Sequence, residues 1–281
     1  MFPYHSHQMN PAWNYGPVLS VQNISHSFGA KQILHQLSLD VQSGDWIGII
    51  GPNGSGKSTL LSLMSRAQAP SRGEIFLQGR AINSYKRKEL SRHMAVLQQE
   101  ALPPVSYTVR EVVEMGRFPY QSFWGLEKED SQVFIDGIME RLQLEDLHDR
   151  PMDQLSGGQR QRVALAKLMA QSPDIVLLDE PTTYLDIHYQ VQFMEMVRSW
   201  QNDCGLTVIS VLHDLNLAAL YCNRLVVLED GKLVAEGSPD EIMTQEQLED
   251  VFQVNTVIVE HPEIERPQIL VSPNLPTRKV K

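Results

Sequence analysis

Cysteine is scarce in this chain of 281 residues, which contains only Cys204 and Cys222. The two cysteines form neither a CxxC pair nor a metal-ligand spacing, so nothing points to a thiolate metal site. The simplest interpretation is two buried thiols in a protein of a reducing compartment. Long apolar runs are absent as well, because none approaches the roughly 18 residues that a membrane-spanning helix needs.

Basic residues are scarce at the start of the chain, where the first lysine or arginine is Lys31. A signal peptide begins with a charged region and an apolar core, so none is indicated, and we expect a cytosolic chain whose membrane role would go through a partner. The formal net charge of −10 argues against a nucleic-acid coat protein, although a local basic groove stays possible. The hydrophobic content of 42% and the charged content of 21% are ordinary for a globular protein.

The apolar periodicity predicts an α/β fold. Residues 1–17 contain three prolines and no aliphatic periodicity, so we interpret them as a flexible extension. Helical periodicity is expected over 57–64 and through most of 109–147. The segments expected to form strands are 19–24, 33–41, 46–51, 74–79, 94–99, 175–179, 207–212 and 224–229.

Strands that alternate with helices predict a parallel sheet covered on both faces. We expect one large domain over 18–260, with a helical subdomain inserted at about 100–170. Past Pro239 two short helices are expected, and then a hairpin between 257–260 and 268–271. Residues 261–281 are assigned to this hairpin and a tail.

The segment GPNGSGKST fits the phosphate-loop pattern GxxxxGK[ST], with an apolar strand before it and a helix after it. The glycines let the main chain approach phosphate closely, Lys57 would reach the β- and γ-phosphates, and the Ser58 hydroxyl would ligate Mg²⁺. The residues expected to bind ATP here are Gly51, Pro52, Asn53, Gly54, Ser55, Gly56, Lys57, Ser58 and Thr59. No internal repeat follows, so the chain holds one nucleotide module.

Polar side chains end three further strands. Asp179 closes the strand IVLLD, where a magnesium carboxylate belongs, and Glu180 is placed to take a proton from an attacking water. His213 follows TVISVL and could hold that water and the γ-phosphate, because ligands bind at the carboxyl edge of such sheets. Gln99 could contact Mg²⁺ or water, with Gln98 as the alternative. Without the phosphate loop, acids that merely solubilise a strand end would be as good an interpretation.

The segment LSGGQRQR, residues 155–162, contains no carboxylate, cysteine or histidine. Ser156 and two glycines precede an apolar-periodic run, which is how a chain presents bare backbone N–H groups at the start of a helix. Such a helix start attracts anions. The sequence therefore predicts a second anion site, separate from the phosphate loop.

These three motifs together resemble the ATP-binding subunits of ABC transporters, over a match from about Val18 to the end of the chain. The resemblance implies a P-loop NTPase core with a mostly parallel sheet, an N-terminal antiparallel β part and an inserted helical subdomain that contacts membrane subunits. It implies that two copies pack head to tail. The residues that would then act across the dimer are Ser156, Gly157, Gly158, Gln159 and Asp186. Phe28 takes the position that stacks on adenine, where a core aromatic is the alternative.

The segment TVREVVEMGRFPYQS, the DEPTTYLD variant at 179–186 and the closing hairpin resemble importers of ferric siderophores, haem and cobalamin. Tyr120 and Gln98 depart from that pattern, which often has histidine and proline there. The resemblance implies an ATPase that uses ATP and Mg²⁺ and lies at the cytoplasmic face of a membrane. Its partners would be a permease and, indirectly, an external binding protein, and it would not bind nucleic acid. Another ABC importer or exporter, or an ABC protein acting on ribosomes or DNA, is the alternative.

Overall fold

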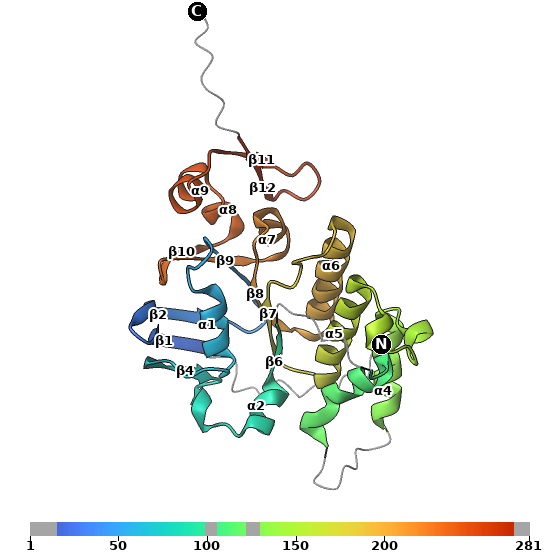
Figure 1. The fold of residues 1–281 in the computed structure, drawn as a ribbon. Coiled ribbons are helices and arrows are strands. Elements are labelled where there is room, and N and C mark those ends of the chain that lie inside the picture. Colours follow the sequence, from blue (N-terminus) through green and yellow to red (C-terminus); the bar gives the residue numbers. More distant parts are fainter. Residues whose placement is uncertain (1–15, 99–105, 122–129, 273–281) are drawn as a thin grey trace, which may run out of the picture.

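The structure, a computed structural model, describes residues 16–98, 106–121 and 130–272. At its centre is a six-stranded sheet of order β10-β9-β3-β8-β7-β6, in which only the β9–β10 pair is antiparallel (Figure 1). Its strands are β3 (Trp46–Ile50), β6 (Met94–Leu97), β7 (Ile175–Asp179), β8 (Thr207–Val211), β9 (Arg224–Glu229) and β10 (Lys232–Gly237).

The continuous apolar runs of β3 and β8 are buried along their whole length. Successive side chains of a strand point to opposite faces of a sheet, so Ile47 and Ile49 belong to one hydrophobic core while Trp46 and Ile50 belong to another. This two-sided burial confirms the parallel sheet that the sequence predicts.

One face of the central sheet is covered by α1 (Lys57–Met64) together with a second, antiparallel sheet. That sheet has the order β2-β1-β4-β5, from β1 (Leu19–Phe28), β2 (Lys31–Val41), β4 (Arg72–Leu77) and β5 (Arg80–Ala81). The turn η2 (Ile82–Ser84) and helix α2 (Arg87–His93) then lead into β6. The antiparallel part is present as predicted, and it means that helices alone do not cover this face.

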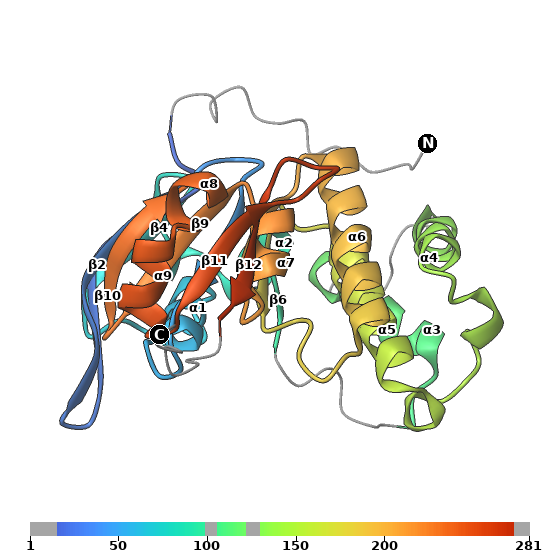
Figure 2. The same ribbon diagram turned by 90° about the horizontal axis from the view of Figure 1, so that it is seen from above.

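The other face is covered by the helices α5 (Gly157–Gln171), α6 (Ile187–Cys204) and α7 (Leu215–Tyr221). A helical lobe lies beyond them, formed by α3 (Val109–Glu114), η3 (Met115–Tyr120) and α4 (Asp130–Arg141). Figure 2 shows this lobe on the far side of α5 and α6 from the sheets. The short turns η4 (Glu145–Leu147) and η5 (Met152–Gln154) connect it to α5.

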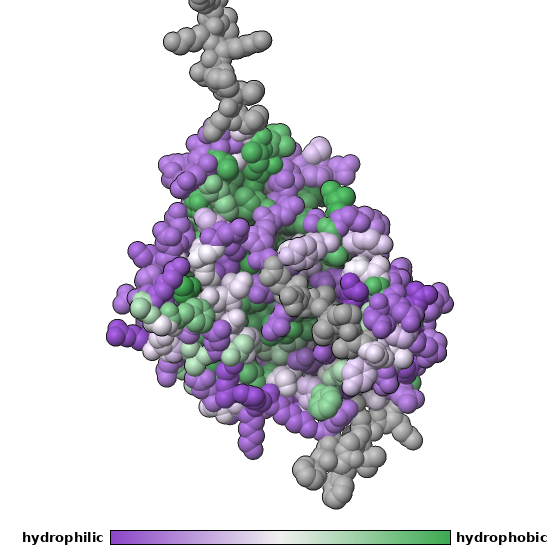
Figure 3. Space-filling model, in the orientation of Figure 1, coloured by the Kyte–Doolittle hydropathy of each residue, from purple (hydrophilic) through white to green (hydrophobic). Residues whose placement is uncertain are grey.

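Two short helices, α8 (Pro239–Ile242) and α9 (Gln245–Phe252), are followed by a hairpin of β11 (Thr256–Glu260) and β12 (Pro267–Val271). The predicted hairpin pairing is confirmed. Asn216 joins it to α7, because its side chain donates to the Ile269 carbonyl at 3.3 Å and accepts from the Ile269 N–H at 2.7 Å. Exposed apolar side chains of the hairpin contribute to the hydrophobic surface at this end (Figure 3).

One prediction about the thiols is wrong. Cys222 is buried, and burial raises the pKa of its thiol to about 12, but Cys204 is exposed. The reason is its place in the last turn of α6, immediately before Gly205 ends the helix in the left-handed conformation. In the described ranges no helix combines the length and apolarity needed to cross a membrane. The expected extension over residues 1–17 lies almost wholly outside the described residues.

Candidate functional site

The phosphate loop joins β3 to α1, and two of its glycines are required by close approach. A β-carbon at Gly51, where φ is +146°, would lie 2.0 Å from the Leu228 carbonyl oxygen. At Gly56, where φ is +102°, it would lie 2.7 Å from a Leu34 methyl group. At Gly54, where φ is +81°, an added β-carbon would meet no atom within 4 Å outside the neighbouring residues, so this position faces open space. Loop geometry of this kind suits a phosphate chain held by main-chain N–H groups.

Lys57 is buried beneath this loop. Its ammonium donates hydrogen bonds to the carbonyl oxygens of Gly51 and Pro52, both at 2.9 Å. Burial lowers the pKa of Lys57, while the carboxylates of Glu180 and Asp179 act in the opposite direction. The Lys57 ammonium is therefore held in place by two carbonyl groups of the phosphate loop.

Ser58 and Asp179 meet although 121 positions separate them in the sequence. The Ser58 hydroxyl donates to Oδ1 of Asp179 at 3.0 Å. Burial raises the pKa of Asp179, and the hydrogen bond from Ser58 partly offsets that rise. A hydroxyl and a carboxylate oxygen side by side are the hard ligands that Mg²⁺ prefers, usually together with phosphate oxygens. The residues present thus fit a magnesium ion.

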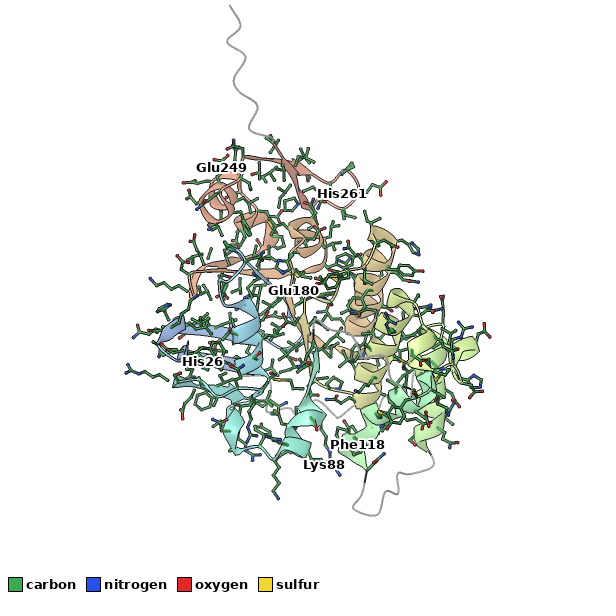
Figure 4. All side chains as sticks on the ribbon, viewed as in Figure 1. His26, Lys88, Phe118, Glu180, Glu249 and His261 are labelled. Carbon is green, nitrogen blue, oxygen red and sulfur yellow. The ribbon has the colours of Figure 1, made fainter. Side chains whose placement is uncertain are left out.

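Glu180 and His213 form the second polar pair of this edge. Nε2 of His213 lies 2.5 Å from Oε1 of Glu180, and the Thr183 hydroxyl contacts the other carboxylate oxygen at 3.3 Å. In the sheet, β8 lies between β3 and β7, so His213, the phosphate loop and Asp179 lie at the carboxyl ends of three adjacent strands. Figure 4 shows Glu180 near the middle of the molecule. Acids that merely solubilise a strand end would not be held in this way.

Two other predicted contacts with the nucleotide have different outcomes. Phe28 is 52% exposed and meets His26 edge-to-face at 4.8 Å, so the alternative of a core aromatic is wrong. The exposure of the ring leaves it accessible to a base. Gln98 follows β6 and is exposed, whereas Gln99 lies outside the described residues.

The helix start at Ser156 is exposed, and two of its backbone N–H groups, those of Ser156 and Gln159, are capped and not bare. The Ser156 hydroxyl accepts from the Gln159 N–H at 3.3 Å, and the Gln159 side chain accepts from the Ser156 N–H at 2.9 Å, which forms a capping box. A β-carbon at Gly158 would lie 2.7 Å from the Tyr189 ring, whereas Gly157 has open space around it. Gly158 therefore serves the packing of α5 on α6.

Asp186 occupies the equivalent position at the start of α6. Its carboxylate accepts from the Tyr189 N–H at 3.0 Å and caps the helix. Around it Tyr184 and Ile187 are strongly exposed. Each of the two helix starts is thus capped within its own turn and faces outward, and in the described residues their capping bonds do not involve the phosphate loop.

Gln161, which lies in the segment LSGGQRQR (residues 155–162), was not singled out from the sequence. This side chain is buried, and its Nε2 donates to the Pro181 carbonyl at 2.6 Å, next to Glu180. The available signal was spacing, because Gln161 shares a helix face with the buried Ala164, Leu165 and Leu168. A polar residue on an apolar face needs a hydrogen-bond partner.

A family model described as ABC transporter matches residues 34–183. The ferric enterobactin transport ATP-binding protein FepC of Escherichia coli (strain K12) is 38% identical over 241 residues, which cover 86% of this chain and 89% of that protein. The iron(3+)-hydroxamate import ATP-binding protein FhuC of Bacillus subtilis (strain 168) is 37% identical over 252 residues, with 90% and 94% covered.

Two solved structures resemble the fold. One is an inward-facing conformation of an ABC transporter assigned provisionally to the metal-chelate type. It superposes with a TM-score of 0.79 at 26% identity, covering 92% of this chain and 98% of that one. A dimeric ATP-binding cassette in a post-hydrolysis state, bound to ADP and Pi, superposes with a TM-score of 0.69 at 28% identity, covering 78% and 98%.

Proposed function

The chain belongs to the ABC transporter family as an ATP-binding, ATP-hydrolysing subunit, and from that premise we propose that it energises the import of an iron chelate through a partner permease. The observation that carries the hydrolytic part is the contact of Glu180 with His213 beside the Ser58–Asp179 pair. The iron chelate is supported by the names of the two relatives and by the GRFP segment at 116–119.

Glu180 is the general base of this proposal. Its carboxylate takes a proton from the water that attacks the γ-phosphate, and His213 holds the carboxylate through Nε2. Lys57 neutralises phosphate charge, and Phe28 stacks on adenine. Mg²⁺ would be held by Ser58 and Asp179, with Gln99 as a further ligand, and it would supply positive charge that stabilises the phosphate oxygens.

The active form of this proposal is a head-to-tail dimer of two copies. Ser156 is exposed and has its capping bonds within its own turn, so the surface around it is open to a second chain. Nearby, Tyr184 is 92% exposed, and an exposed large apolar side chain is typical of a surface that a partner covers. Gly157, Gly158, Gln159 and Asp186 would contribute backbone and side chains to this interface.

The permease docks, in this proposal, at the end of the molecule where α2 meets the helical lobe. The Phe118 side chain there is 66% exposed, and Figure 4 labels it together with Lys88 at this end of the molecule. Lys88 contacts the Gln121 carbonyl, and Nε of Arg92 donates to the Pro119 carbonyl at 2.9 Å. A groove of about 250 Å³ lies alongside, lined by Ser65, Arg66, Ala67, Arg87, Leu90, Ser91, Met94 and Val96.

Such a docking puts the chain at the cytoplasmic face of the membrane, and an external binding protein would deliver the chelate to the permease. The test is to purify the tagged chain from membranes of its own host and to identify the protein that co-purifies. A polytopic permease, together with lost uptake of radiolabelled ferric siderophore in a deletion strain, is expected. Ribosomal protein, DNA, or a defect in export alone would overturn the proposal.

A mixing experiment tests the dimer. In the proposed dimer each ATP site is composite: the phosphate loop of one chain forms the cradle, and the Ser156 helix start of the other chain forms the lid. Ser156→Arg damages the lid, and Lys57→Ala damages the cradle. Homodimers of either variant carry two damaged sites, whereas a heterodimer combines an intact cradle with an intact lid at one site. Phosphate release is therefore expected to reappear on mixing. If heterodimers form and no activity above the unmixed variants is measured, Ser156 does not act across the dimer.

A further inference from the structure

Gln161 connects the helix that begins at Ser156 to the loop that begins at Glu180. It lies five residues after Ser156 on α5 and is only 8% exposed. Its Nε2 donates to the Pro181 carbonyl oxygen at 2.6 Å in a buried hydrogen bond. Pro181 follows Glu180 directly, so this bond is one peptide unit from the residue that carries the general base.

The loop after β7 needs such support because its backbone is strained. Glu180 has φ +49°, a conformation that few residues other than glycine adopt, and a proline follows it. Three elements hold the loop in place. β8 does so through a hydrogen bond from the Glu180 N–H to the Val211 carbonyl at 3.1 Å, α6 through Gln190 to the Thr182 carbonyl at 3.2 Å, and α5 through Gln161.

We infer that Gln161 is a positioning residue for Glu180 of its own chain. Ser156 and Gln161 belong to one motif, but they face different ways. Ser156 faces outward towards the proposed second copy, whereas Gln161 points inward to the loop after β7 of its own chain. The inference rests on the proposed roles of Glu180 and of Ser156. Loss of the Gln161 donor leaves a buried carbonyl unpaired and lets the strained loop relax, which moves Glu180 from the line of attack.

The first test separates positioning from folding. Gln161→Met keeps the length of the side chain and removes the donor. Gln201→Met is the matched control, because Gln201 donates to the Gly44 carbonyl at 2.9 Å near the opposite edge of the sheet. We expect Gln161→Met to lower kcat about 10- to 100-fold without changing the KM for ATP by more than about twofold. The control is expected to lose thermal stability to a similar degree and to keep its kcat.

The second test asks which chain Gln161 serves. In the heterodimer of Ser156→Arg and Lys57→Ala, the working site takes Glu180 from the Ser156→Arg chain and Ser156 from the Lys57→Ala chain. Gln161→Met is added to one chain or to the other, and phosphate release is compared at equal heterodimer content. The rate is expected to fall about 10-fold or more when the change is in the chain that supplies Glu180, and less than about twofold in the other case.

The outcomes are distinguishable. Equal losses in both placements, a larger loss in the chain that supplies Ser156, or no loss in either placement would overturn the positioning role. Absence of activity in the parental mixture instead contradicts the proposed dimer, and the kcat and KM of the Gln161→Met homodimer then decide about Gln161 alone. A rise in KM with unchanged kcat in that measurement would also overturn the inference.

Discussion

We propose that anions bind both at the phosphate-loop edge, which comprises the loop 51–59 with Asp179, Glu180 and His213, and at the helix start of Ser156, but the two regions differ in their contacts. At the phosphate-loop edge, side chains far apart in sequence contact each other, as Ser58 and Asp179 do across 121 positions. At the helix start, the capping bonds of Ser156 reach only to Gln159, three residues away. The fold of one chain therefore assembles the first region, and we propose that a second copy of the chain completes the other.

Charge separates the two regions as well. Burial lowers the pKa of Lys57 and raises the pKa of Asp179, so the phosphate-loop edge holds opposite charges at a desolvation cost. The helix start carries no ionisable side chain from Ser156 to Gln159 and offers only dipoles and a hydroxyl. These charges support proton transfer as the proposed role of the first region and closure over a bound anion as the proposed role of the second.

The largest expected effect is at the general base. Glu180→Gln keeps the shape of the side chain and removes its basic oxygen, so steady-state hydrolysis is expected to fall about 100-fold or more. ATP still binds, and an ATP-dependent dimer accumulates because closure is no longer followed by hydrolysis. Phosphate release and size-exclusion chromatography measure the two effects.

The comparison would fail if Glu180→Gln retained wild-type turnover, since Glu180 would then not be the base. Glu195→Gln serves as the matched control because it makes the same chemical change on α6, where Oε1 of Glu195 accepts a hydrogen bond from the Tyr221 hydroxyl at 2.7 Å. That variant is expected to hydrolyse ATP at nearly the wild-type rate.

A smaller effect on stability and activity is expected at Gly158, and the adjacent Gly157 provides the control. Gly158→Ala places a β-carbon 2.7 Å from the Tyr189 ring, so α5 must shift, at a cost of about 1–3 kcal/mol in the free energy of unfolding. ATPase activity is expected to fall about 10-fold, because the lid moves with the helix. Gly157→Ala meets no atom within 4 Å and should change the unfolding free energy little. Equal denaturant midpoints for the two variants would contradict this account.

At the proposed metal site, loss of the Ser58 hydroxyl is expected to affect Mg²⁺ binding and not the binding of nucleotide alone. Ser58→Ala removes a proposed Mg²⁺ ligand and is expected to weaken the apparent Mg²⁺ affinity of hydrolysis about 10-fold. Binding of a fluorescent ATP analogue in EDTA should change much less. If both measurements declined in parallel, the substitution would have deformed the loop rather than removed a ligand.

The smallest expected effect concerns the buried carboxylate without nucleotide or metal. Because the pKa of Asp179 is raised on folding, protonated Asp179 contributes to the free energy of unfolding at low pH. This contribution is lost as the pH rises through the pKa of the folded state. Asp179→Asn cannot undergo this loss, so its Tm in EDTA should exceed that of the wild type by a few degrees near neutral pH. The gain should shrink as the pH is lowered towards about 4. A Tm difference independent of pH would contradict the assigned cause.

Much of the fold could be predicted because its signals are local. The run IVLLD forms β7 over the predicted residues, and α1 begins and ends where the sequence indicates. The length of β1 was underestimated by four residues, since Ser25–Phe28 alternate weakly and depend on pairing with β2. The exposure of Cys204 was missed because a single residue near a helix end carries no periodicity.

The sequence alone determined which segments carry chemistry. A GxxxxGKS loop between strand and helix, an acidic pair at a strand end and a serine before two glycines are patterns of local backbone geometry, which neighbouring residues impose. Only the tertiary structure decided what these groups contact. The insertion of β8 between β3 and β7 brings His213 to Glu180, and the packing of α5 directs the Gln161 side chain to the Pro181 carbonyl in the loop after β7. Such contacts join residues that are distant in sequence, and strand order and helix packing are set by burial over the whole chain.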